Sequence, residues 1–260
     1  MDGNRRYAKA NNLPLQGGHN AGANSLFDVL DASYNIGIKY ITIYAFSIEN
    51  FNRSQAEVDT LLGMLRDKLK LMSDREDSYA RFNKVKICIV GNRSMIPEDI
   101  LKDLEKIEEK TKQAKSGKVL NVCFPYTSRD DIAHSIRSIT EKFESREIDS
   151  KDQISLQMLA DNMYMGPGTP PLDILVRTSG HTRLSDFMLW QCNYNCTIEF
   201  TETLWPDFKF LGVISILLKW SYFKTMQLEN QKPKSEAIRR NTQHLNSLPT
   251  APPFASVTDR

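Results

Sequence analysis

Two polar segments, far apart in the sequence, contain the residue types that bind phosphate groups. The stretch RTSGHTRLSD places Arg177 and Arg183 six residues apart, with Ser185 close behind them. Guanidinium groups bind phosphate oxygens in pairs, and each charged hydrogen bond contributes about 1.5–3 kcal/mol. This loop therefore suits a phosphate or diphosphate, although a solvated basic loop would have the same composition.

The stretch DGNRR, near the start of the chain, suits the same kind of ligand. Backbone N–H groups at an expected helix start, together with Arg6, would attract an anion. Asp2 would repel that anion unless a divalent cation lay between them, and Mg²⁺ prefers one or two carboxylates plus phosphate oxygens. The stretch therefore indicates a diphosphate and Mg²⁺ site; the alternative is a simple turn that caps a helix.

Two further stretches contain groups that could act on such a ligand. FSIENFNR contains Ser47, Glu49, Asn50 and Arg53. The glutamate could merely cap a helix or pair with the arginine, whereas the asparagine could orient a substrate or pass a proton. His19, in QGGHNAG, could contact a phosphate that the glycines allow to approach the backbone, or it could simply begin a helix.

These polar stretches follow segments with a strand pattern. Runs rich in β-branched and aromatic residues predict strands at 38–46, 85–91, 119–126, 172–176 and 197–200. Apolar periodicity predicts helices at 21–37, 54–81, 97–115, 128–143, 155–164, 187–194 and from Phe210 onward, where the helix closes the core. Such alternation predicts a mostly parallel sheet flanked on both faces by helices, with its ligand at the carboxyl ends of the strands.

Five residues indicate where helices begin and end. Ser54 with Glu57 forms a capping-box pattern, and Ser128 is a further candidate cap. Pro97 is typical of a first helical residue, and Gly37 of a residue just past a helix end.

The composition limits the function. The chain has 260 residues, which suit one sizeable domain or two small ones. A net charge of +2 argues against nucleic acid as a partner. The most apolar stretch, 210–223, is shorter than the roughly 20 residues of a membrane span, so we predict a helix at an interface and no transmembrane segment. The segment 232–260 is polar and has four prolines, which is typical of a disordered tail.

Six stretches together resemble one family. DGNRRYAK, GH, YAFSIENFNR, CFPYTSRDD, RTSGHTRLSDFMLWQ and LWPDF occur in this order in cis-prenyltransferases, the undecaprenyl and dehydrodolichyl diphosphate synthases. The resemblance covers nearly all of residues 1–225. Within the family, the sequence is most similar to the fungal dehydrodolichyl diphosphate synthase subunits. It implies a catalytic domain at 1–231 with an apolar tunnel between the sheet and the first two helices. The implied reaction is Mg²⁺-dependent, repeated condensation of isopentenyl diphosphate onto an allylic diphosphate such as farnesyl diphosphate, with cis stereochemistry.

The resemblance also assigns roles to individual residues. It makes Asp2 the Mg²⁺ ligand, and it places the allylic diphosphate against the backbone of Gly3 and Asn4 and the side chains of Arg5, Arg6 and His19. It places isopentenyl diphosphate against Arg177, Arg183 and Ser185. It implies that the reacting centre consists of Phe46, Ser47, Glu49, Asn50 and Arg53, and that Asn50 assists proton loss.

The sequence departs from the family pattern at several positions. Bacterial members have an arginine four residues before the histidine, where this chain has Leu15. Their second metal ligand, a glutamate, aligns with Thr197, so Glu199 is carried over only as a substitute candidate. A short apolar strand precedes DGNR in the family, and we expect that strand to be missing in front of this sequence.

An Arg-x-Gly motif ends the single-subunit members and does not occur in this sequence. We therefore expect a heteromer in which a homologous, catalytically silent subunit supplies the motif and docks on 210–223. We expect the long product, used for dolichol and protein glycosylation, to leave into a membrane at the cytosolic face of the endoplasmic reticulum or a lipid droplet. The alternatives are that this chain is itself the silent subunit, or that it is a nucleotide- or RNA-binding module.

Overall fold

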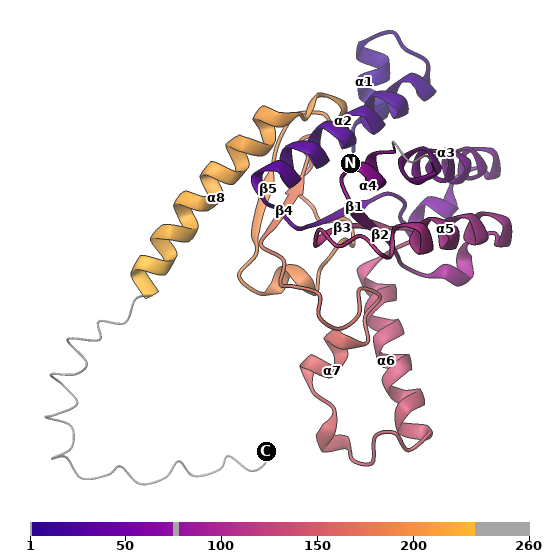
Figure 1. Cartoon of the computed structure of the whole chain (residues 1–260), viewed down its shortest axis with the longest axis vertical. Coiled ribbons are helices and arrows are strands. Elements are labelled where there is room, and N and C mark those ends of the chain that lie inside the picture. The colour runs from indigo at the N-terminus through magenta and orange to yellow at the C-terminus, as the bar shows by residue number, and fades with distance from the viewer. Residues whose placement is uncertain (1, 75–77, 232–260) are drawn as a thin grey trace, which may run out of the picture. The chain divides into compact units, whose positions relative to one another are not determined.

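The computed structural model of the chain describes residues 2–74 and 78–231 (Figure 1). The contacts divide the chain into two units. The first ends at Ile216 and contains every described strand, and the second begins at Leu217, within the last helix. The expected polar tail, 232–260, lies outside the described residues.

All described strands pair in parallel. β1 (Tyr40–Tyr44), β3 (Lys118–Cys123) and β2 (Val85–Val90) form one sheet in that order, with β3 at its centre. β4 (Ile174–Arg177) and β5 (Thr197–Phe200) form a second, two-stranded sheet. The predicted parallel arrangement is therefore confirmed, but its hydrogen-bonded ladders lie in two sheets.

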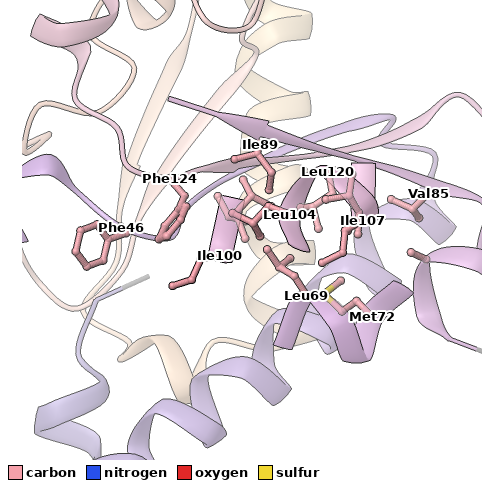
Figure 2. Close-up of a cluster of buried hydrophobic side chains, with 14 of the residues drawn as sticks. Phe46, Leu69, Met72, Val85, Ile89, Ile100, Leu104, Ile107, Leu120 and Phe124 are labelled. Atoms are coloured by element: carbon pink, nitrogen blue, oxygen red, sulfur yellow. The ribbon is translucent and has the colours of Figure 1, made fainter. Parts of the chain in front are cut away.

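One face of the three-stranded sheet carries the main core. Alternate residues of β2 and β3, such as Ile89 and Leu120, point toward α3 (Gln55–Ser73) and α5 (Glu98–Thr111), as Figure 2 shows. Fully burying each such side chain stabilises the fold by about 1.5–3 kcal/mol. The other face carries a smaller cluster of Val90, Cys123 and Tyr126, covered by aromatic residues from later loops. The expected apolar tunnel stays a prediction.

The remaining helices pack around these sheets. α1 (Asn4–Ala10) contacts α2 (Leu15–Ile36), and α6 (Ser128–Glu144) contacts α7 (Leu156–Asp161). The short helical turns are η1 (Ile48–Asn52), η2 (Arg93–Met95), η3 (Lys151–Gln153), η4 (Gln191–Asn193) and η5 (Trp205–Asp207).

The helix predicted at 54–81 is confirmed at Gln55–Ser73, but its predicted continuation to residue 81 is wrong. α3 ends at Ser73, whose hydroxyl donates back to the Leu69 carbonyl, and a separate short α4 (Tyr79–Phe82) begins after Ser78. Serine hydroxyls compete for backbone hydrogen bonds in this way and favour helix ends. The helix predicted at 187–194 is also wrong beyond the three residues of η4, because Met188 has a φ of 50°, in the left-handed region.

The predicted helix ends are confirmed in part. Gly37 follows α2 with a φ of 106°, as expected. Pro97 and Ser128 are each shifted by one position, because Pro97 precedes the first helical residue of α5 and Thr127 caps α6. Ser54 makes no side-chain cap, and its expected partner Glu57 pairs with arginines instead.

The last helix, α8 (Phe210–Gln231), departs from its expected place in the core. Phe210 and Leu211 are 52% and 79% exposed, because their side chains find no cover within the first unit. The later turns also expose apolar side chains, among them Leu218, Tyr222, Phe223, Met226 and Leu228. None of the helices in the described part of the chain is both long and apolar enough to cross a membrane.

Candidate active site

The two predicted anion-binding segments meet at the carboxyl end of β4. Arg177, its last residue, places Nη2 3.5 Å from Oδ2 of Asp2. Nη1 of the same arginine donates to the Ser185 hydroxyl at 2.7 Å and to the Arg183 carbonyl. Residues 175 positions apart in the sequence thus form one cluster of a carboxylate, a guanidinium and a hydroxyl.

The turn that carries Asp2 is anchored through its backbone. The Asp2 carbonyl accepts from the Trp205 N–H at 3.1 Å and from the Ser179 hydroxyl. Arg6 donates to the Ser179 carbonyl at 2.9 Å. Gly3 has a φ of 97°, and a Cβ there would collide with the Ser179 hydroxyl, so the turn requires glycine.

Asp2 is an anion at neutral pH. Partial burial alone would raise its pKa, but the Gly3 N–H, which donates to Oδ1 at 2.7 Å, His181 and Arg177 together hold the pKa below its usual value. His181 lies 3.7 Å from Oδ2, and sequence reasoning missed it as a site residue. Its only signal was its place in the TSGH loop beside the arginines.

Asn4 and α2 are held together by a close approach at Gly22. A Cβ on Gly22 would meet the Asn4 side chain and lie 3.0 Å from the indole of Trp205. The indole N–H donates to the Gly22 carbonyl at 2.8 Å. Within the described residues, the buried Oδ1 of Asn4 has no hydrogen-bond partner, which leaves an amide ready to bond at the start of α1.

A second basic cluster joins Arg5, Arg53 and His19. Both arginines pair with the Glu57 carboxylate of α3, Arg53 at 2.7 Å. Burial lowers the pKa of His19, Arg5 and Arg53 lower it further, and Glu57 opposes them. The imidazole is therefore neutral at pH 7 in the free protein, and a bound anion would favour its protonation.

Replacing Glu57 by glutamine should lower the pKa of His19 further, because it removes a neighbouring negative charge that raises this pKa. NMR titration of the imidazole protons, assigned with a His19→Gln variant, measures the shift. Asp59→Asn is the matched control on the same helix and should leave the pKa of His19 unchanged. A pKa of His19 that rises in Glu57→Gln would contradict this electrostatic description.

The residues expected at the reacting centre lie in and beside η1. The Ser47 N–H donates to Oδ1 of Asn50 at 2.9 Å, and the Glu49 N–H donates to the Ser47 hydroxyl at 3.2 Å. The side-chain oxygen of Asn50, Oδ1, thus caps η1. The side-chain NH₂ group of Asn50 makes no hydrogen bond within the described residues. Phe46 is 3% exposed and packs its ring against Phe124, so it supports η1 from the core.

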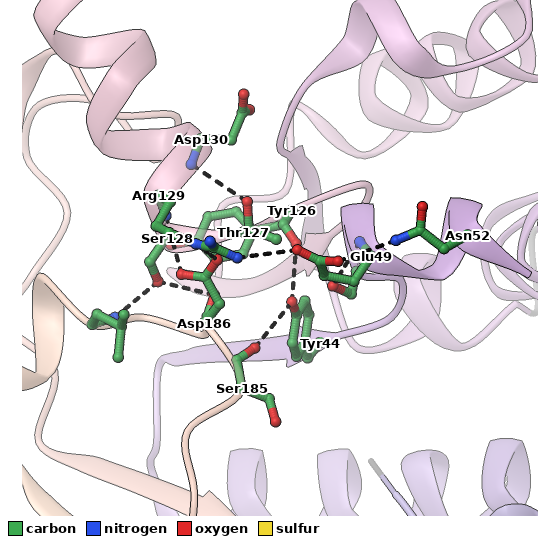
Figure 3. A network of polar contacts seen from close by, with 12 residues as sticks. Tyr44, Glu49, Asn52, Tyr126, Thr127, Ser128, Arg129, Asp130, Ser185 and Asp186 are labelled. Carbon is green, nitrogen blue, oxygen red and sulfur yellow. Dashed lines mark hydrogen bonds and ion pairs between the residues drawn. The ribbon is translucent and has the colours of Figure 1, made fainter.

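A network of polar contacts fixes the loop after β4 against η1 and α6 (Figure 3). Arg129 donates to Asp186 at 2.7 Å and to Glu49 at 3.0 Å. The Tyr44 hydroxyl donates to the Tyr126 carbonyl at 3.0 Å, and its ring stacks on Phe187 at 4.5 Å. Sequence reasoning missed Arg129 and Asp186, although both follow strand ends in the polar stretches it singled out.

The other predicted site residues make fewer contacts with the candidate site. The Arg183 side chain is exposed and has no partner within the described residues. Glu199 lies on β5 opposite Val176, one residue before Arg177. Among the described residues, no group of three or more His, Cys, Asp or Glu side chains could hold a metal ion. A protein-only metal cage is therefore not formed there, and the metal role of Glu199 stays a prediction.

The chain is similar to known prenyl diphosphate synthases. It is 40% identical to a dehydrodolichyl diphosphate synthase complex subunit of Saccharomyces cerevisiae, over 99% of this chain and 78% of the relative. It is also 40% identical to the corresponding human complex subunit, over 85% of this chain and 65% of the relative.

Two solved structures share its fold. Lavandulyl diphosphate synthase from Lavandula x intermedia, in complex with dimethylallyl diphosphate, has a TM-score of 0.77 at 30% identity, over 85% of this chain and 92% of that one. A probable undecaprenyl diphosphate synthase from Campylobacter jejuni has a TM-score of 0.66 at 24% identity, over 78% and 89% of the two chains, and it supports the fold alone. The family described as putative undecaprenyl diphosphate synthase matches residues 1–226, and the chain belongs to that family of cis-prenyltransferases.

Proposed function

We propose that the chain is the catalytic subunit of a cis-prenyltransferase that makes a long-chain polyprenyl diphosphate of the dehydrodolichyl type. The substrates are isopentenyl diphosphate and an allylic diphosphate such as farnesyl diphosphate. The observation that carries the proposal is the meeting of Asp2 with Arg177 and Ser185, because it puts a carboxylate and a diphosphate-binding arginine on one edge.

Different residues of the chain bind each of the two diphosphates. Arg5, Arg6 and His19 bind the allylic diphosphate near the start of α1, while Arg177, Arg183 and Ser185 bind isopentenyl diphosphate. Holding both substrates in line contributes much of the rate, and the arginines stabilise the charge on the departing diphosphate. The Asn50 amide lies in η1 beside this edge. It assists loss of the proton that a carbon of the isopentenyl unit gives up to the released diphosphate as the new double bond forms.

The donor set fits Mg²⁺ when a diphosphate is bound. One ionised carboxylate, Asp2, faces the diphosphate-binding groups, and Mg²⁺ prefers a few carboxylates supplemented by phosphate oxygens and water. When bound, the ion neutralises charge on the leaving diphosphate. Glu199 is the candidate for an additional ligand from β5.

A second subunit completes the enzyme in this proposal. The chain lacks an Arg-x-Gly motif, and its yeast and human relatives are named as complex subunits. The exposed apolar side chains of α8, such as Phe210 and Leu211, suit a docking surface for a homologous, catalytically silent subunit. The product would pass to a membrane, at the endoplasmic reticulum or a lipid droplet, and serve dolichol synthesis and protein glycosylation.

Activity is expected to depend on the partner. The chain is incubated with farnesyl diphosphate, radiolabelled isopentenyl diphosphate and Mg²⁺, with and without a fungal partner subunit, and the products are sized. Long products should form at least ten-fold faster with the partner, as expected for a missing transition-state contact. Full activity of the chain alone would refute the need for a partner. No product from either mixture would refute the catalytic role and favour a silent subunit.

A further inference from the structure

The amino-terminal edge of the three-stranded sheet is strongly basic. Three segments, 35–39, 79–84 and 112–118, lead into β1, β2 and β3. They contain six basic residues and no acidic one: Lys39, Arg81, Lys84, Lys112, Lys115 and Lys118. The whole chain has 34 basic and 32 acidic residues, so this edge is a local concentration of charge rather than a reflection of composition. We call these six residues the basic edge.

The pairing of the strands brings the three segments side by side. The Val119 N–H donates to the Lys39 carbonyl at 2.7 Å, which joins the first segment to the third. The Ser116 hydroxyl donates to the Lys84 carbonyl, which joins the third segment to the second. The six charges therefore lie on neighbouring turns of one end of the sheet.

Most of these charges are not neutralised within the described part of the chain. Lys39, Arg81, Lys84 and Lys115 are exposed and form no ion pair there. Lys112 lies 3.3 Å from Glu109, and both side chains are about two-thirds or more exposed, so their pairing contributes little. Among the described residues, the edge therefore exposes four basic side chains that have no ion-pair partner.

Exposed apolar side chains accompany the charges. Phe82 is 79% exposed and lies between Arg81 and Lys84, while Ile36 and Tyr40 are 48% and 43% exposed. A large apolar ring that is almost fully exposed among lysines is unfavourable in water, but it suits the boundary between lipid headgroups and acyl chains. Nucleic acid would also bind the positive charges, but it offers no apolar surface for the exposed side chain of Ile36.

The basic edge lies opposite the candidate active site. Figure 2 shows Val85, at the start of β2, and Phe46 and Phe124, past the ends of β1 and β3, at opposite ends of the row of buried side chains. At about 3.3 Å per residue, a strand of this length separates its two ends by roughly 16–20 Å. A surface bound at the basic edge would leave Asp2 and Arg177 open to diphosphates dissolved in water.

We propose that the basic edge and Phe82 bind an anionic membrane surface. The lysines attract the phosphate and carboxylate groups of anionic lipids, and the phenyl ring enters the interface. This inference deepens the proposed function, since it names the surface through which an enzyme with a lipid product meets its membrane. It needs no catalytic step, so it can be tested independently.

The test is sedimentation of the full chain with phosphatidylcholine vesicles, with and without phosphatidylserine. Binding should require phosphatidylserine and weaken as salt is added. Lys39→Glu with Lys115→Glu should weaken binding at least ten-fold, because each basic residue near an anionic surface contributes about a five-fold factor. Lys102→Glu with Lys151→Glu changes the net charge equally on other elements and should leave binding within about two-fold. Phe82→Ser should weaken the binding that remains at high salt.

Equal loss in both double variants would overturn the proposal, as would binding that ignores lipid charge. Selective binding of a single-stranded oligonucleotide, lost in the Lys39 and Lys115 variant, would overturn it in favour of nucleic acid. Product formation in detergent is measured in parallel and should be unchanged in every variant. If the parent chain binds vesicles but forms no product, the result would count against the proposed function and would still support the membrane-binding surface.

Discussion

Replacing Asp2 by asparagine is expected to lower the turnover number for prenyl transfer by about 10²–10³-fold, the usual effect of removing one preorganised electrostatic contact. Asparagine keeps a carbonyl oxygen that can accept the Gly3 N–H, so the turn should persist. It removes the negative charge that lies 3.5 Å from Arg177 and faces the proposed diphosphate site. The loss should therefore fall on kcat and on the Mg²⁺ concentration required, rather than on folding.

Asp67→Asn is the matched control for this variant. Asp67 lies on α3 with its side chain 68% exposed, and the same change of charge there should leave kcat within about two-fold. Thermal unfolding of both variants should match that of the parent chain. If Asp2→Asn makes product as fast as the parent in the presence of the partner, the chain is the silent subunit and the proposed catalytic role is wrong.

Periodicity and strand composition predict most of the elements that position the site. Each of the five expected strands exists, and the polar stretches that follow them come together as the rule for parallel sheets requires. Such predictions work because strand runs and helix stripes depend on burial of neighbouring residues, which the sequence shows directly. The resemblance implies diphosphate ligands, where spacing alone left open a choice between a phosphate site and a solvated loop.

Predictions that depend on competing partners are less successful. Glu57 fits a capping box by its spacing from Ser54, but Arg5 and Arg53 reach its carboxylate in the folded chain. Arg5 is 52 residues away, so no local pattern could reveal the competition. The same holds for Arg129, which is 57 residues from Asp186 and which joins the loop after β4 to η1.

Backbone conformation is the second limit on what the sequence predicts. Ser185, Asp186 and Met188 all have φ between 50° and 60°, a region that residues with a Cβ seldom adopt, and they replace the expected helix at 187–194 with an irregular loop. Contacts from α6 and β1 hold this conformation, among them the Ser128 N–H to the Asp186 carbonyl at 2.8 Å. Tertiary contacts thus override a local helix preference where the loop must present Ser185 to Arg177.

Replacing Gly3 by alanine is expected to destabilise the chain by about 1–3 kcal/mol, the usual cost of a strained backbone position. It should also lower activity, for two separable reasons. Gly3 has a φ of 97°, which alanine adopts only under strain, and the new Cβ would collide with the Ser179 hydroxyl and lie 3.0 Å from Leu204. The turn would have to shift, and Asp2 would move with it away from Arg177.

Gly63→Ala is the matched control, and it should have the opposite sign. Gly63 lies within α3 with no atom near its would-be Cβ, so alanine there should stabilise the chain by about 0.5–1 kcal/mol. Ser179→Gly removes the hydroxyl that the new methyl group at position 3 would meet, and it also frees a residue whose φ is 81°. Adding it to Gly3→Ala should therefore recover part of the lost stability, measured by thermal and denaturant unfolding against Ser179→Gly alone.

The double variant separates the collision from the backbone strain. Recovery of stability together with kcat would show that the collision displaces Asp2. Because Ser179→Gly also removes the bond from this hydroxyl to the Asp2 carbonyl, kcat is compared with that of Ser179→Gly alone. Recovery of stability with a kcat below that of Ser179→Gly would mean that the φ at position 3 itself sets the direction of the Asp2 carboxylate. If Gly3→Ala alone is as stable and active as the parent chain, the anchored turn described here does not position Asp2. Arg177 and Arg183 would then have to bind the diphosphate without a fixed carboxylate opposite them.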